Sequence, residues 1–211
     1  MKSPTHRHRQ PVTTRGRSTA ERIVASARRH FLTHGFRRVT MDDLARELGM
    51  SKKTLYASFQ SKSLLLEAVI VHKFRQVEQD LDKISSGCSS NVLASLQGLL
   101  ACMQQHTDEI KPPFVRDMQR ESPETFKMVE VRRRNVIQRH FGKLLAAGRK
   151  AGIIRKDVPP DLILEILLSA VQAIMNPPKI MEWGLTPKSG YSAIVTVILE
   201  GVMTDRGRAA L

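Results

Sequence analysis

The chain has 211 residues, of which 41% are apolar and 5% aromatic, and it carries a formal net charge of +14. This length fits one large domain, or a small domain followed by a larger one. The chain has no uncharged stretch long enough to span a membrane, and its first residues lack the apolar centre of a secretory signal. The two cysteines, Cys88 and Cys102, fit neither a disulfide framework nor a zinc site. We therefore expect a cytoplasmic protein without a metal or cofactor.

The positive charge is concentrated near the N-terminus. Residues 1–62 contain 14 Lys and Arg against 4 Asp and Glu, whereas residues 63–211 contain 20 against 16. A positive field concentrated in this way favours a polyanionic partner, with nucleic acid ahead of a membrane surface. A soluble protein with a basic tail would have the same composition, so the charge alone does not decide between the two.

The N-terminal part of the chain predicts a basic arm followed by helices. Residues 1–17 mix Pro, Thr, His, Arg and Gly without periodicity, which is typical of a disordered arm. Apolar residues then recur at helical spacing over 18–34. Further helices are expected from Thr40, which forms a capping box with Asp43, to about 48, from Ser51 to about 58, and from Ser61 to about 84.

The second half of the chain predicts long helices separated by Gly, Ser and Pro breakers. We expect a linker over 85–90 and helices over 91–106, 114–120, 123–150, 161–175 and 193–203. The last two are apolar nearly all round, so they must be covered on every side. Two such helices near the C-terminus indicate a subunit interface, which charges at Leu168 and Val197 are expected to disrupt. No strand pattern is evident, so the predicted fold is all-α.

Residues 41–59, MDDLARELGMSKKTLYASF, have the spacing of a helix-turn-helix motif. Gly49 suits the tight turn between the two helices, and a small core would form from Leu44, Leu48, Met50 and Leu55. In such a motif the second helix enters the major groove of DNA. Hydroxyl groups, lysines and small residues suit phosphate oxygens and base edges. The outward face of this helix carries Ser51, Lys52, Lys53, Thr54, Tyr56 and Ala57.

Three stretches extend this pattern: HGF (34–36), VTMDDLARELGMS (39–51) and TLYASFQSKSLLLEAV (54–69). With them, residues 18–70 resemble the N-terminal domain of tetracycline-repressor (TetR) family regulators. The resemblance implies that Thr40, Thr54, Tyr56 and Lys62 hold phosphates, and that Ser51, Lys52, Lys53 and Ala57 face the groove. Ala57 departs from the aromatic or polar residue often found there, which shifts part of the readout to phosphates and DNA shape.

Over the rest of the chain the resemblance is one of layout, and it implies an effector cavity. Met and aromatic side chains suit an adaptable apolar pocket, although core packing is the competing interpretation for each of them. The candidate ligand-binding residues are Met103, Phe114, Met118, Val171, Met175 and Trp183. His106 and Gln172 are candidates for orienting the ligand. The run Arg132, Arg133 and Arg134 is interpreted as a solvated helix face that can pair with Glu130.

The sequence therefore predicts a basic arm (1–17), a three-helix DNA-binding domain (18–62) and a larger helical effector-binding and dimerisation domain (63–211). The expected function is a homodimeric transcriptional repressor, released from a palindromic operator in double-stranded DNA by a small apolar effector. Two alternatives remain open: a helical enzyme with a basic anion-binding N-terminus, and an architectural DNA-binding protein without an effector. No nucleophile elbow, P-loop or HExxH motif is present, so no catalytic residue is expected.

Overall fold

The computed structural model describes residues 18–86, 91–175 and 177–209, and all the helices and strands assigned within them are α-helices. They are α1 (Thr19–His34), α2 (Met41–Glu47), α3 (Lys52–Ser58), α4 (Lys62–Ser85), α5 (Val92–Asp108), α6 (Pro112–Glu121), α7 (Pro123–Lys150), α8 (Pro160–Ile174), α9 (Pro177–Glu182), α10 (Pro187–Val202) and α11 (Asp205–Arg208). The predicted all-α fold is confirmed. None of these helices is long and apolar enough to cross a membrane. The basic arm, 1–17, and Cys88 lie outside the described residues.

Most helix boundaries follow the capping residues and breakers that the sequence contains, and the last helices are the exception. Helices α9 and α11 were not predicted, and α10 begins at Pro187 instead of at 193. The cause is Thr186, whose Oγ1 accepts a hydrogen bond from the N–H of Ser189 at 3.1 Å. The segment that follows this cap is too polar for an apolar pattern to reveal it as helix.

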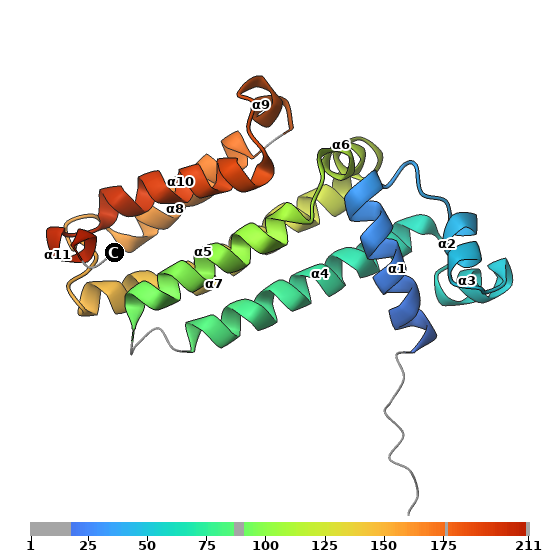
Figure 1. Cartoon of the computed structure of the whole chain (residues 1–211), viewed down its shortest axis with the longest axis horizontal. Helices are drawn as coiled ribbons and strands as arrows, with labels where there is room; N and C mark the ends of the chain where they lie inside the picture. Colours follow the sequence, from blue (N-terminus) through green and yellow to red (C-terminus); the bar gives the residue numbers. More distant parts are fainter. Residues whose placement is uncertain (1–17, 87–90, 176, 210–211) are drawn as a thin grey trace, which may run out of the picture.

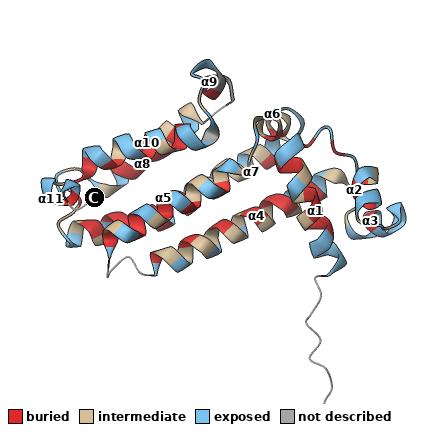
Figure 2. Ribbon diagram, in the orientation of Figure 1, coloured by how far each residue is buried: buried red, intermediate tan, exposed pale blue. Residues whose placement is uncertain are grey.

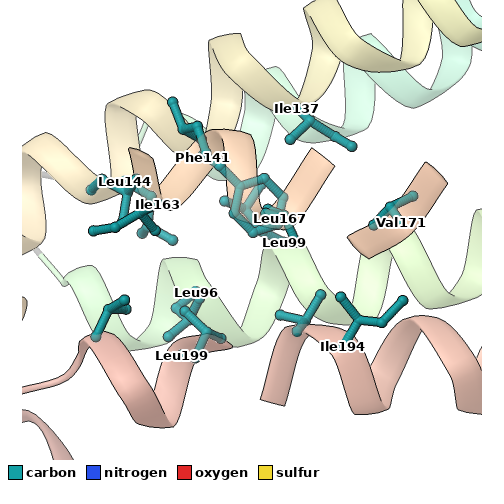
Figure 3. Packing of buried hydrophobic residues seen from close by; sticks show 14 of the residues in the cluster. Leu96, Leu99, Ile137, Phe141, Leu144, Ile163, Leu167, Val171, Ile194 and Leu199 are labelled. Carbon is teal, nitrogen blue, oxygen red and sulfur yellow. The ribbon is translucent and has the colours of Figure 1, made fainter. Parts of the chain in front are cut away.

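The long helices α4, α5 and α7 run side by side, with α1, α2 and α3 at one end of them (Figure 1). Helix α8 packs on α7, while α10 packs on both α5 and α8. Figure 3 shows this packing from close by, where Leu99 of α5, Phe141 of α7 and Leu167 of α8 meet. The DNA-binding motif and the α8–α10 pair therefore lie at different ends of the bundle.

Two clusters of buried apolar residues form the core. The smaller cluster joins α1, α2, α3, the first half of α4, and Phe114 and Met118 of α6. The larger one joins the second half of α4 to α5, α7, α8 and α10, and Phe74 of α4 packs against both clusters. Helix α4 is therefore shared by the two cores, although the expected domain division at residues 62 and 63 falls at its first turn.

The buried face of α4 differs from the expected one in two respects. The sequence pattern predicts an apolar face formed by Leu64, Leu65, Ala68, Val69, Val77 and Leu81. Leu64 is instead 47% exposed, whereas Leu66, two residues further along the helix, is fully buried. The stripe continues through Val69 and Ile70 and then includes a charged residue, Lys73, which is only 5% exposed. A lysine buried in this way must find partners, and they lie at the candidate ligand site.

Candidate DNA-binding surface and ligand cavity

Side-chain caps hold both helices of the helix-turn-helix motif. Thr40 Oγ1 accepts a hydrogen bond from the N–H of Asp43 at 3.1 Å, and the carboxylate of Asp43 accepts one from the N–H of Thr40 at 3.2 Å. At the start of α3, Ser51 Oγ accepts from the N–H of Thr54 at 3.1 Å. These bonds satisfy N–H groups that a helix N-terminus otherwise leaves unpaired. Thr40 and Ser51 thus have a structural role besides their predicted contacts with DNA.

The turn between α2 and α3 depends on Gly49, and α3 is anchored by one side chain. Gly49 has a φ of 62°, a left-handed conformation that costs a residue with a side chain about 1–2 kcal/mol. Leu55 is the buried residue of α3, at 0% exposure, and it belongs to the same cluster as Leu44 and Ala45. Burial of such a side chain contributes about 1.5–3 kcal/mol. Every other α3 side chain is exposed.

Helix α3 is largely exposed (Figure 2). The exposed residues include the predicted DNA contacts Ser51, Lys52, Lys53, Thr54, Tyr56 and Ala57, and Thr40 at the start of α2 is exposed as well. Lys52 forms an ion pair with the carboxylate of Asp42. Within the described part of the chain, Lys53 has no ion-pair partner. Lys53 can therefore meet a phosphate or base edge directly, whereas Lys52 must exchange Asp42 for DNA.

Lys62 is the predicted phosphate contact that is not fully exposed. Its Nζ donates a hydrogen bond to the carbonyl oxygen of Arg37 at 3.3 Å and lies 4.4 Å from the ring centre of Phe36. Burial lowers the pKa of the Lys62 ammonium, against the opposing charges of Asp117 and Glu121. Without DNA, Lys62 thus ties the start of α4 to the loop between α1 and α2.

A cavity of about 390 Å³ is lined by residues of helices α1, α4, α5, α6, α7, α8, α9 and α10. Most of its lining is apolar, and the size falls within the range of about 300–1,000 Å³ that is typical of small-molecule sites. Five of the six predicted ligand-binding residues line it, namely Met103, Phe114, Met118, Val171 and Met175, together with His106 and Gln172. These residues come from three helices, α5, α6 and α8, and from the residue that ends α8, so the fold gathers positions that are far apart in the sequence.

Trp183 lies outside this lining, which corrects one prediction. The residues before it form the short helix α9 at the edge of the bundle instead of continuing α8 (Figure 1). The indole is 50% exposed, and Lys179 Nζ lies 5.3 Å from its ring centre. Trp183 is therefore a surface residue that directly follows α9.

The cavity wall also contains a network of hydrogen-bonded polar side chains that the sequence did not predict. Lys73 Nζ donates hydrogen bonds to the carboxylate of Glu109 at 2.8 Å and to Nδ1 of His106 at 3.1 Å. Because Nδ1 accepts, the proton of neutral His106 is on Nε2, which donates to Asp80 at 3.2 Å. Burial lowers the pKa of Lys73, which Glu109 opposes. The sequence signal for this network is a lysine that interrupts the apolar stripe of α4.

Arg133 also lines the cavity, so its interpretation as part of a solvated face is wrong. Burial lowers the pKa of its guanidinium, and Glu130, one helical turn away, forms its ion pair at 3.7 Å. The neighbouring Arg134 points elsewhere and pairs with Glu165 of α8 at 2.6 Å. Consecutive residues of a helix point in different directions, so the three arginines do not share one role.

Two histidines are buried in neutral form. His140 is 0% exposed, and its Nδ1 lies 2.8 Å from Ser85 Oγ. Because the Ser85 hydroxyl donates to the carbonyl oxygen of Leu81 at 2.7 Å, His140 Nδ1 is the donor to Ser85. Burial lowers the pKa of His140, and burial followed by the charge of Lys73 lowers that of His106. Protonation of either ring would place an added charge in the core.

These histidines make the free energy of unfolding pH-dependent. The unfolded chain binds their protons near the ordinary histidine pKa of about 6.5, whereas the folded chain does so only at lower pH. The stability that comes from burying neutral histidines is fully present above the unfolded-state pKa of about 6.5. It is lost as the pH falls below that value, because only the unfolded chain then gains the protons. We expect urea denaturation to give a clearly lower free energy of unfolding at about pH 5.5 than at about pH 7.5, and H106Q to reduce the difference. Equal stability of the wild type at both pH values would contradict this assignment.

Helix α6 touches both the cavity and the DNA-binding domain. Phe114 and Met118 line the cavity, while Asp117, on another side of the helix, accepts a hydrogen bond from the N–H of Arg37 at 2.9 Å. At the start of α6, the N–H of Lys111 donates to the carbonyl oxygen of Leu32 at 3.0 Å. The segment that leads into the helix-turn-helix motif is therefore bonded to a helix of the cavity wall.

An exposed basic helix of a helix-turn-helix motif, joined to a helical domain with an apolar cavity, is the arrangement expected of a DNA-binding transcriptional regulator. Residues 23–69 match the family described as bacterial regulatory proteins, tetR family. Over these residues the chain matches the N-terminal domain of TetR family transcriptional regulators, and the resemblance noted in its sequence is confirmed.

One relative and two solved structures are similar to the chain over most of its length. The chain is 25% identical over 190 residues to the HTH-type transcriptional regulator YvaF of Bacillus subtilis, an uncharacterised protein, covering 88% of this chain and 96% of that one. The ketosteroid transcriptional regulator KstR2 of Mycobacterium tuberculosis is 19% identical, with a TM-score of 0.57 over 92% of this chain and all of that one. SmeT, the repressor of the Stenotrophomonas maltophilia efflux pump SmeDEF, is 19% identical, with a TM-score of 0.63 over 89% and 92%. The family and YvaF indicate a regulator rather than an enzyme.

Proposed function

We propose that the protein is a repressor whose homodimer binds a palindromic operator and is released when a small, mostly apolar effector occupies the cavity. The position of α6 carries this proposal, because one helix supplies cavity wall and also holds the chain that enters the DNA-binding motif. A ligand that wedges Phe114 and Met118 outwards would move Asp117 and its bond to Arg37. Such coupling requires only that the ligand prefer one of two arrangements, typically by about 1–3 kcal/mol.

The effector part of the proposal rests on the cavity and on one neighbour. A structure of SmeT similar to this chain, at 17% identity and a TM-score of 0.61 over 88% of this chain and 92% of that one, is a complex with triclosan. An architectural DNA-binding protein would need no cavity, so the apolar cavity favours an effector-responsive regulator over that alternative. Helix α4 would transmit motion between the effector-binding domain and the DNA-binding domain proposed from the sequence, because its two halves lie in different cores.

The dimer part rests on the outer faces of α8 and α10. Leu162 and Ile166 of α8 are 50% and 48% exposed, and Val197 of α10 is 71% exposed. Both helices also bury apolar residues within their own chain (Figure 2), among them Leu168 at 7% exposure. The sequence-based choice of Leu168 as an interface residue is therefore wrong, since a charge there would disrupt the chain's own core. The outward residues offer a self-complementary surface for a two-fold axis.

A homodimer would place two copies of α3 about 34 Å apart, one turn of DNA, to enter successive major grooves. Selection of bound sequences from a random DNA pool tests this directly. We expect an enriched palindrome whose half-sites are about one helical turn apart, or a multiple of that spacing. Enrichment of a single unpaired site, or of no sequence at all, would contradict the proposal.

Tyr56 and Lys62 are proposed to position the protein on phosphates. The variant Y56F should weaken binding to operator and to unrelated DNA alike, by about tenfold, because a phosphate contact carries no sequence information. K62A should in addition lower the slope of log affinity against log salt concentration by about one contact, whereas Y56F should leave that slope unchanged. Fluorescence anisotropy at several salt concentrations measures both quantities. A loss confined to the operator would show that Tyr56 reads bases instead.

A further inference from the structure

The ammonium group of Lys73 has one donor to spare at the cavity wall. An ammonium has three N–H donors, and two of them are used by Glu109 and by Nδ1 of His106. Among the described residues it has no further hydrogen-bond acceptor. The side chain is 5% exposed and lines the cavity, so the cavity is the side from which a further acceptor can reach it. A ligand oxygen in the cavity would complete its hydrogen bonding.

The ionised groups in and behind the cavity wall leave one positive charge uncompensated. Three cations, Arg28, Lys73 and Arg133, face two carboxylates, Glu109 and Glu130. His106 is neutral for the reasons given above, and its partner Asp80 is itself paired with Lys83 at 2.9 Å. A buried charge without a counter-ion is costly. The local charge balance is therefore that of a site for a single negative charge.

Tyr191 of α10 adds a second unused donor to the lining. It is 2% exposed, and its hydroxyl has no hydrogen-bond partner among the described residues. Burial raises the pKa of Tyr191, as does the neighbouring Cys102 thiol, which is itself influenced by the charge of Lys73. Tyr191 and Lys73 line the same cavity, from α10 and α4. An acceptor supplied by a ligand would relieve the cost of this orphaned hydroxyl.

We infer that the effector is an apolar monocarboxylic acid whose carboxylate is bound by Lys73, with Tyr191 donating a second hydrogen bond. The inference rests on the proposed function, since it takes the cavity to be the effector site. The apolar part of the ligand lies along the remaining wall, which includes Phe74, Val136 and Ile137. One carboxylate accepts from both donors and supplies the missing negative charge, which a neutral ester or alcohol cannot do.

The test compares matched ligands that differ only in their head group. Decanoic acid, methyl decanoate, decanol and decylamine provide a linear series, and butylbenzoic acid with its methyl ester provides an aromatic pair. Each compound is titrated into the full-length protein by calorimetry below its micelle concentration, and each is also tested for release of the selected operator. We expect at least one acid to bind about tenfold or more tightly than its own ester, because a charge-assisted hydrogen bond is at stake.

Two variants assign this preference to the proposed residues. K73M keeps the length of the side chain and leaves Glu109 paired with Arg28, so the chain should fold, and it should abolish the preference for acid over ester. Y191F should leave the unliganded melting temperature unchanged or slightly raised, because it removes an orphaned hydroxyl, yet weaken acid binding about fivefold. A tyrosine with a purely structural role would not produce these opposite effects.

The outcomes separate this inference from the proposed function. Equal binding and equal operator release by acids and their esters would overturn the inference and leave the apolar effector in place. Acid binding that K73M leaves intact would also overturn it. If no compound of either series binds or releases the operator, both the inference and the proposed effector site are wrong.

Discussion

Glutamate at both Ile166 and Val197 should convert the protein to a monomer and lower its operator affinity more than 100-fold, because the second half-site then no longer adds its binding energy. Both side chains are about half exposed or more, on the outer faces of α8 and α10. Two charges per chain would be buried without partners in a self-complementary interface. Sedimentation velocity at micromolar concentration measures the assembly, and anisotropy measures the affinity.

The matched control for this double variant is V131E. Val131 is 54% exposed, but it lies on α7, outside the proposed interface. We expect V131E to remain a dimer and to bind the operator like the wild type. A wild type that sediments as a monomer, or an I166E/V197E variant that remains a dimer, would contradict the proposed interface.

Alanine at Gly35 should destabilise the fold by about 3 kcal/mol and weaken the coupling between cavity and DNA-binding motif. Gly35 ends α1 with a φ of 91°, and a Cβ built there lies 2.5 Å from Asp117 Oδ2. The substitution therefore combines an unfavourable backbone conformation with a collision against α6. Asp117 would have to move away, breaking the hydrogen bond that it accepts from Arg37.

Alanine at Gly49 provides the control for the backbone effect alone. Gly49 also has a positive φ, 62°, but a Cβ there meets no atom within 4 Å among the described residues. We expect G49A to cost about 1 kcal/mol and to preserve effector-induced release. Urea denaturation and operator-release titrations of both variants give the comparison. Equal costs for G35A and G49A would show that the approach of α6 to Gly35 is unimportant.

Much of the fold could be predicted because its helices carry local start and stop signals. Ser18, Thr40, Ser51, Ser61 and Asn91 all cap helices in the structure, and Gly35 and Gly49 take the left-handed turns. The DNA-binding motif lies within one short segment, so its spacing alone fixes which residues face outwards. Where the signals are weak, as at α9 and the start of α10, the prediction failed.

The cavity was harder to predict because residues distant in the sequence form it. Apolar residues such as Met103 and Met118 were found because Met suits a pocket, but the same reasoning wrongly included Trp183. Periodicity could not fix the rotation of α4 closely enough to separate Leu64 from Leu66. Lys73 and Tyr191 both lie within apolar stripes, where composition suggests plain core packing. Only the tertiary structure shows that they meet an enclosed space.

The most direct test of the account is the thermodynamic reciprocity between cavity and operator. The affinity of a cavity ligand for the full-length protein is measured by calorimetry with and without saturating operator DNA, and operator affinity is measured with and without saturating ligand. If the cavity controls DNA binding, both affinities must fall by the same factor, expected to be about 5–150. The same ligand should lose its effect in G35A. A ligand that saturates the cavity and leaves operator affinity unchanged would contradict the account.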